Sequence, residues 1–138
     1  METRSTQLIN LRPLIPSAKV YENMSNDEAF QNTTLRPIAK LQNDLLIAVF
    51  KNYIAKRKHV FYDLSLQKQM AYIENAIHKD MKFRNSLKGM IIGQFTTEEY
   101  ELYIQNSSAL NKRMMTIVKE RLLSNIQLFI KPDFLKAV

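Results

Sequence analysis

The sequence contains two histidines, His59 and His78, which are its only imidazole groups for metal binding or proton transfer. Glu74 lies one helical turn before His78, so on a helix both side chains could bind the same metal ion. His59 or Asp80 could supply a third ligand. An ordinary surface pair on a helix explains the spacing of Glu74 and His78 equally well. The residues Glu74, His78 and His59 are therefore candidate metal ligands, weighed against this simpler interpretation.

Motifs for other kinds of catalysis are missing from the sequence. There is no cysteine, which excludes disulfides, thiolate metal ligands and a cysteine nucleophile. The two glycines, Gly89 and Gly93, are too few for the glycine-rich loops that bind nucleotide phosphates. Ser65 and Lys68 match a Ser-x-x-Lys pattern of β-lactamases, but the companion motifs are missing. We therefore predict no catalytic residue and no cofactor.

Basic side chains outnumber acidic ones by 20 to 13, which gives a net charge of +7. The excess lies beyond residue 34 and favours anionic partners, although it also serves solubility. A helix-turn-helix within residues 81–105 is disfavoured, because Glu98, Glu99 and Glu101 would face phosphates at the start of its second helix. The candidate nucleic-acid-binding residues are Lys56, Arg57, Lys58, Lys82, Arg84, Lys88, Lys112 and Arg113.

Glycine, proline and turn residues predict an all-α fold. No proline lies between Pro37 and Pro132, and the Asn-Gly and Asp-Gly turns that close β-hairpins are missing. We expect a compact bundle of about five to six helices. Residues 1–24 contain two prolines and no sustained apolar period, which predicts an extended N-terminal arm. Residues 25–138 are then a single helical domain.

Capping residues and proline predict where the first helices of this domain begin. Ser25 fits the start of a short helix that ends near Thr33, and Pro37 suits the first turn of the next helix. The helix expected over residues 37–57 is apolar almost all the way round between Leu45 and Phe50. This predicts that other helices enclose it as the central element of the bundle.

Further caps divide the rest of the chain. Asp63 or Ser65 can begin a helix whose apolar stripe changes phase near Asp80. We expect a break there, with Asp80 capping a helix over residues 81–93, although one long bent helix also fits. A capping box begins at Thr96. The last two helices are expected over residues 97–105 and 107–129.

The last helix presents apolar side chains over more than half of its circumference, among them Met114, Met115 and Ile117. Helices of the same chain, a second copy or a partner helix could cover them, and methionine-rich surfaces adapt to partners. Met114, Met115 and Ile117 are therefore candidate residues for binding a protein partner or forming a homodimer.

No stretch of the sequence predicts a membrane span. The longest apolar run, Leu45–Phe50, is far shorter than the ~20 residues that cross a bilayer. Residues 1–14 lack the apolar core of a signal peptide. With the absence of cysteine, this predicts a cytoplasmic protein with no membrane partner.

Four stretches resemble a family of small bacterial proteins that often carry the label glyoxalase. They are Thr34–Leu46, Tyr72–Ile77, Phe83–Gly93 and Asn106–Met115. The resemblance covers residues 25–129, and its label implies a metal-dependent lyase. Glyoxalase I, however, resembles a paired β-α-β-β-β fold that holds its metal with His and Glu on strands, and this chain shows no strand pattern.

Three functions follow from these patterns. The first is a non-catalytic helical protein that acts through protein–protein contacts, because its helices are broadly apolar and catalytic motifs are missing. The second is nucleic-acid binding by the basic helical surface. The third is a metal-dependent lyase of glyoxalase type, as the family label suggests, centred on Glu74 and His78.

Overall fold

The computed structural model of the chain describes residues 3–136, which are predominantly helical and contain no β-strand. The predicted all-α class is confirmed. The described residues form more helices than the five to six expected, because several are short and separated by kinks. The α-helices are α1 Thr3–Leu11, α2 Asn26–Phe30, α3 Arg36–Leu41, α4 Asn43–Lys56, α5 Leu66–His78, α6 Met81–Ile92, α7 Thr97–Tyr103, α8 Ser107–Ser124 and α9 Asp133–Lys136. A π-helix spans Gln31–Leu35, and 3₁₀ turns span Val60–Asp63 and Ile126–Leu128.

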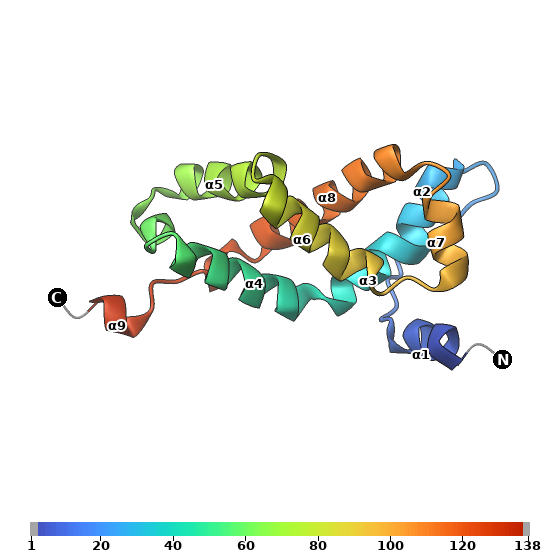
Figure 1. Cartoon of the computed structure of the whole chain (residues 1–138), viewed down its shortest axis with the longest axis horizontal. Helices are drawn as coiled ribbons and strands as arrows, with labels where there is room; N and C mark the ends of the chain where they lie inside the picture. Colours follow the sequence, from blue (N-terminus) through green and yellow to red (C-terminus); the bar gives the residue numbers. More distant parts are fainter. Residues whose placement is uncertain (1–2, 137–138) are drawn as a thin grey trace.

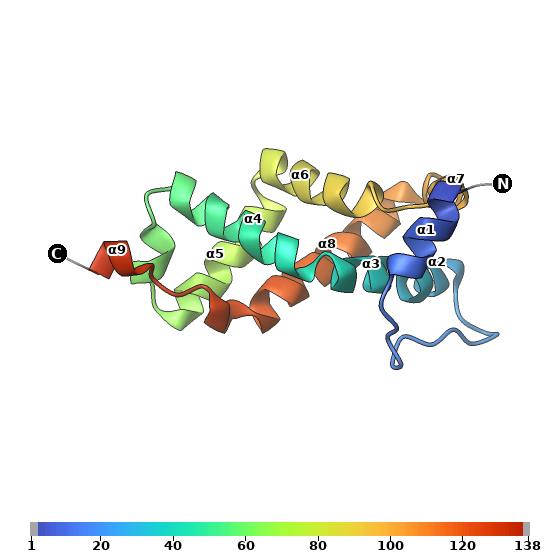
Figure 2. The same cartoon turned by 90° about the horizontal axis from the view of Figure 1, so that it is seen from below.

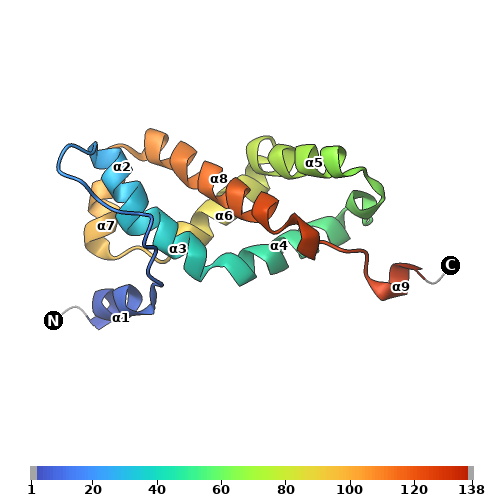
Figure 3. The ribbon, with the colours of Figure 1, turned by 180° about the vertical axis from the view of Figure 1, so that it is seen from behind.

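Helix α8 is the central element of the fold. It packs against α3, α4, α5, α6 and the π-helical segment, and it runs through the middle of the molecule in all three views (Figures 1, 2 and 3). Its buried side chains include Met114, Met115 and Ile117. Helices of the same chain cover Met114 and Met115, so the expectation that they form a partner-binding surface is wrong, whereas Ile117, also buried, lines a groove beside α8.

The segment expected to be central, residues 37–57, is neither one helix nor enclosed. It bends at Gln42, between α3 and α4. Helix α4 buries a single face that includes Leu46 and Phe50, whereas Leu45 on the opposite side is half exposed. The apolar residues on several sides of α4 therefore predicted more burial of this helix than the structure has.

Pro37 lies in the first turn of α3, as predicted, but α3 continues directly from a helical segment that precedes it. The chain is helical from Asn26 through Leu41, because α2 continues into the π-helix and then into α3. Proline cannot donate a backbone hydrogen bond, and its ring crowds the carbonyl four residues earlier. In the wider π-helical turn just before the proline, the amide of Arg36 donates to the carbonyl of Gln31 five residues back.

The predicted caps are found where the sequence places them. Ser25 and Ser65 accept hydrogen bonds from the amides of Glu28 and Lys68, at 3.1 and 3.3 Å. Asp80 accepts one from the amide of the third residue of α6 at 3.2 Å, which confirms the break between α5 and α6. Side-chain caps depend only on neighbouring residues, so local sequence suffices to predict them.

A cluster of aromatic rings fills the core at the α4–α5 end. Phe50 is fully buried, and its ring centroid lies 5.7 Å from that of Phe61 and 5.0 Å from that of Phe129. Edge-to-face pairs of this kind stabilise a core beyond the area they bury. Phe129 follows the 3₁₀ turn after α8, and its ring packs into this cluster. Helix α8 ends at Ser124, earlier than the predicted residue 129.

The N-terminal arm is extended only in part. Residues 3–11 form α1, and irregular chain follows as far as Ser25. Helix α1 lies at the opposite end of the molecule from α9 (Figure 1) and buries none of its side chains fully. Polar contacts must therefore hold it in place. Among the described residues, no helix combines the length and apolarity needed to cross a bilayer.

Candidate functional site

A largely buried ion pair joins the N-terminal segment to α7. The two terminal nitrogens of Arg12 bind the two carboxylate oxygens of Glu99 at 2.6 and 2.7 Å. Only 6% of the Arg12 side chain and 13% of the Glu99 side chain are exposed. Two parallel charge-assisted hydrogen bonds fix both distance and orientation.

The local sequence explains why Glu99 points inward. Glu99 is the third residue of α7, and its carboxylate accepts a hydrogen bond from the amide of Thr96 at 2.8 Å in a reciprocal capping box. The buried hydroxyl of Thr34 donates to the second oxygen at 2.9 Å. Burial raises the pKa of Glu99, but the hydrogen bonds from Arg12, Thr96 and Thr34 outweigh it and leave this pKa below its ordinary value.

Two arginines also bind the turn between α6 and α7. Arg4 donates to the carbonyls of Phe95 and Gly93 at 2.8 and 3.0 Å, and Arg12 donates to the carbonyl of Gln94 at 2.8 Å. Three consecutive carbonyls after a helix end need such donors. Both oxygens of Glu99 are occupied as well, so this cluster positions the N-terminal segment.

An open apolar groove of about 880 Å³ lies beside this ion pair, between α1, α2 and α7. Its lining includes the buried side chains of Phe30 and Leu110. Ile9 and Leu102 also line it, and they are 49% and 56% exposed. Asp27 contributes a negative charge, and its carboxylate accepts a hydrogen bond from Asn106 at 2.7 Å. The groove therefore combines exposed apolar side chains with an acidic edge.

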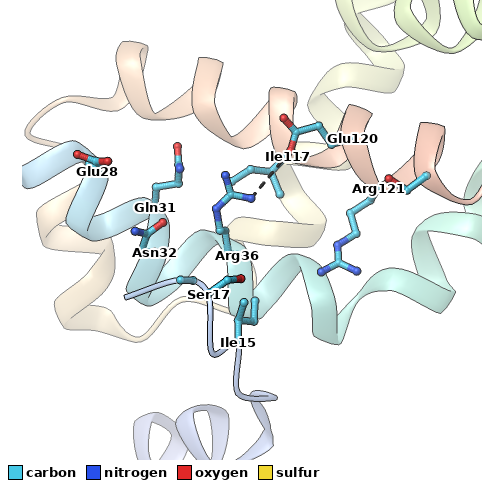
Figure 4. A pocket seen from close by; sticks show the side chains of 11 residues that line it. Ile15, Ser17, Glu28, Gln31, Asn32, Arg36, Ile117, Glu120 and Arg121 are labelled. Carbon is cyan, nitrogen blue, oxygen red and sulfur yellow. Dashed lines mark ion pairs between the residues drawn. The ribbon is translucent and has the colours of Figure 1, made fainter. Parts of the chain in front are cut away.

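A second groove, of about 540 Å³, lies between α8, α2, the π-helix and α3, and Ile15 of the N-terminal segment also lines it. Figure 4 shows Arg36 reaching from α3 toward Glu120 of α8, while Arg121 reaches from α8 across the same space. The Arg36–Glu120 distance is 3.9 Å, longer than a hydrogen bond. This groove is polar, and two guanidinium groups, those of Arg36 and Arg121, line it together with the two carboxylates of Glu28 and Glu120.

Basic residues from two separate helices meet at a third place. Lys56 and Arg57 at the end of α4 and Lys82 at the start of α6 line one hollow of about 250 Å³. Arg57 lies 3.4 Å above the ring of Tyr53 and binds Asp80 at 2.9 Å. Burial and the hydrogen bond to Asp80 raise the pKa of Tyr53 to about 12. Arg57 is therefore held in place, whereas Lys56 and Lys82 extend into solvent.

The other basic candidates do not join this hollow. Arg84 lies beside His78, with 3.4 Å between their side-chain nitrogens, and Arg113 donates to Gln31 at 3.0 Å. Lys58 follows α4 in a left-handed conformation. The two remaining candidates are Lys88, partly buried on α6, and Lys112, exposed on α8. The eight predicted residues therefore do not form one continuous basic face.

The candidate metal ligands are not brought together. Glu74 pairs with Lys119 at 3.8 Å, and the ring of His59 lies beside that of Phe134. Burial, Lys119 and Arg84 lower the pKa of His78. Within residues 3–136 no three His, Asp or Glu side chains are grouped as a metal site would require. The simpler interpretation, a pair of polar residues on a helix surface, describes Glu74 and His78.

Comparison with known proteins gives no match. None of the protein-family models fits the chain, and none of the curated proteins or solved structures is similar to it.

Among the residues that line the two larger grooves, Ile117 was a predicted binding residue, whereas the charged residues of these grooves were not predicted as a site. The inward orientation of Glu99 could have been predicted, because a glutamate at the third position of a capping box turns back toward the helix start. Nothing in the sequence marked Arg12 as its partner, since 87 residues separate them. Arg36 and Arg121 likewise belong to elements whose proximity only the fold reveals.

Proposed function

We propose that the protein acts without catalysis, by binding a partner protein in the apolar groove between α1, α2 and α7. One observation supports this proposal above the others: Ile9 and Leu102 are about half exposed beside a deeper lining of buried apolar side chains. Exposed apolar side chains that line a concave surface are typical of protein-binding sites.

The shape of the groove suits an amphipathic helix. Such a helix places apolar side chains, spaced one turn apart, along a groove of this kind. Covering the exposed parts of Ile9 and Leu102 would contribute about 1 kcal/mol each, because full burial of such a side chain contributes about 1.5–3 kcal/mol. The apolar side chains of the partner add to this.

The charges around the groove indicate a basic partner. Asp27 lies in its lining, and Glu98 and Glu101 are exposed on α7. Arg12 is neutralised by Glu99, so it does not offset these carboxylates. This end of the molecule is acidic although the whole chain carries a charge of +7. Lysine or arginine beside the partner's apolar stripe would complement it.

A designed helical peptide with one leucine face and one lysine face tests the proposal. We expect fluorescence anisotropy to show saturable binding, and the Leu102→Arg substitution to weaken it at least tenfold by placing a cation in the groove. Leu66→Arg is the matched control, because Leu66 on α5 is similarly exposed but lies outside the groove. Equal affinity in both variants would refute the groove as the binding site.

Natural partners can then be sought with the same pair of variants. A protein recovered by affinity purification with the wild-type and Leu66→Arg chains, but lost with Leu102→Arg, supports the proposal if it also cross-links to α7. Light scattering of the purified chain identifies the case in which the partner is a second copy.

We propose nucleic-acid binding as a second candidate function. It is supported by the meeting of Lys56, Arg57 and Lys82 from two helices at one hollow. If about four phosphates are contacted, a plot of the logarithm of the binding constant against the logarithm of salt concentration should have a slope of about −3.6. Removing one contact should make this slope less steep by about 0.9. We expect this reduction in Lys82→Gln but not in the exposed control Lys112→Gln. No binding to DNA or RNA at low salt would refute this candidate.

A further inference from the structure

We infer that the groove between α3 and α8 is a binding site for a small phosphomonoester with an apolar body. This inference is independent of the protein-binding groove, because the two grooves share no lining residue. It is carried by two guanidinium groups, those of Arg36 and Arg121, that face the same space from different helices (Figure 4).

Neither guanidinium has a hydrogen-bond partner among residues 3–136. Arg36 approaches Glu120 only to 3.9 Å, and no carboxylate lies within ion-pair distance of Arg121. Each arginine carries five N–H donors in a planar arrangement. Elsewhere in the molecule Arg12 uses both terminal nitrogens fully. The donors of Arg36 and Arg121 are therefore available to a ligand that carries several acceptor oxygens.

The electrostatics of Arg121 favour an anion. Its side chain is partly buried, and burial together with the charge of Arg36 lowers its pKa from the ordinary value. The charges of Arg36 and Arg121 repel across the groove, and an anion that contacts both guanidinium groups offsets this repulsion. A phosphate group has three free oxygens, so it can accept hydrogen bonds from both arginines at once.

The rest of the lining indicates what the phosphate is attached to. Ile15 and Ala18 of the N-terminal segment and Ile117 of α8 form an apolar side of the groove. Gln31 and Asn32 are already engaged, with Arg113 and with the carbonyl of Lys19. The groove thus offers two guanidinium groups without hydrogen-bond partners among the described residues and an apolar side, with the carboxylates of Glu28 and Glu120 also in its lining, and its volume of about 540 Å³ accommodates a ligand larger than phosphate alone.

Phenyl phosphate is a suitable probe, because it joins a phosphomonoester to an apolar ring. In a ¹H–¹⁵N NMR titration of the whole chain at constant ionic strength, we expect saturable shifts confined to residues 31–36 and 117–124. Arg121→Gln and Arg36→Gln should each weaken binding roughly tenfold or more, because each removes charge-assisted hydrogen bonds. Lys119→Gln is the matched control, since Lys119 lies on the same helix but pairs with Glu74.

Other probes separate the parts of the proposal. Inorganic phosphate should bind more weakly than phenyl phosphate, because it lacks the apolar body, and benzoate should also bind more weakly, because one carboxylate cannot serve both arginines well. Phenol should not bind. The proposal is overturned if phenyl phosphate causes no saturable shifts, if phenol or benzoate binds as tightly, or if both arginine variants, folded by circular dichroism, bind as well as Lys119→Gln.

Discussion

Replacing Glu99 with glutamine should release the N-terminal segment while the helical body stays folded. Glutamine removes the charge that Arg12 binds, yet it can still serve as the third residue of the capping box. Helix α1 buries none of its side chains fully, so the arginine contacts are its main attachment. Arg12 then need not remain buried without a partner, because residues 3–24 can detach and return it to water.

The size of the effect follows from the burial of the pair. Removing one partner of a buried ion pair costs about 3–5 kcal/mol when the other charge stays buried. If residues 3–24 detach instead, the loss of global stability cannot exceed the free energy with which this segment docks on the helical body. The protection of α1 amides against hydrogen exchange, which reports docking itself, should therefore fall about a hundredfold, since about 1.4 kcal/mol corresponds to a factor of ten. Protection of α8 should fall much less.

Glu98→Gln provides the matched control. Glu98 occupies the same first turn of α7 but is exposed. Removing the charge of Glu98 should lower the free energy of unfolding by at most about 1 kcal/mol, through its interaction with the helix dipole. It should leave the hydrogen exchange of α1 unchanged. Hydrogen exchange with mass spectrometry resolves both segments. Unchanged protection of α1 in Glu99→Gln, or equal losses in α1 and α8, would refute the reasoning.

The same contact predicts a pH dependence with a definite sign. The pKa of Glu99 is lowered in the folded chain, so its carboxylate stabilises docking fully above its unfolded pKa of about 4.3. That contribution disappears as the pH falls through the folded pKa. Protection of α1, corrected for intrinsic exchange, should therefore be constant between about pH 7 and 5 and decrease below about pH 4. Glu99→Gln should lack this decrease.

Four substitutions elsewhere should change the free energy of unfolding in predictable directions, as measured by urea denaturation. Tyr72→Phe should stabilise the folded chain by up to about 1 kcal/mol, because the buried hydroxyl of Tyr72 has no hydrogen-bond partner in residues 3–136. Tyr53→Phe should instead destabilise it, because this change removes the 3.0 Å hydrogen bond to Asp80. Gly89→Ala should stabilise by about 0.5–1 kcal/mol, because an added Cβ meets no atom within 4 Å in this helix. Lys58→Gly should stabilise slightly, because Lys58 has a φ of 59° that favours glycine.

Local sequence was sufficient for features that depend on neighbouring residues. The helix starts capped by Ser25, Ser65, Asp80 and Thr96 were all predicted, because each cap acts within one turn. Pro37 was placed correctly in the first turn of α3, but the helical segment that runs into this turn was not predicted. A proline usually marks the start of a helix, and the π-helical turn that accommodates it here leaves no pattern that single-sequence reasoning recognises.

The candidate sites could not be predicted, because each depends on contacts between distant segments. Arg12 meets Glu99 only after α6 and α7 are in place. Lys56 and Lys82 belonged to two basic clusters, and nothing in their spacing showed that they would line one hollow. Charge counts alone predicted a basic surface, whereas the fold brings Lys56 and Lys82 to one hollow and places Arg84 and Arg113 elsewhere.

The choice between α4 and α8 as central element shows which property of a helix matters. Helix α4 has the longest apolar run of the sequence, yet its buried residues form one narrow stripe and Leu45 stays half exposed. Helix α8 carries several charges, but its buried side chains spread over a wider arc that includes Met114, Met115 and Ile117. A wide arc can contact helices on several sides at once, whereas a narrow one contacts a single layer. Because Met114 and Met115 of α8 are covered by the same chain, they do not form a surface for a partner protein. Ile9 and Leu102 are the half-exposed apolar pair whose neighbours already form a groove, which is why the proposed protein contact is placed at α1 and α7.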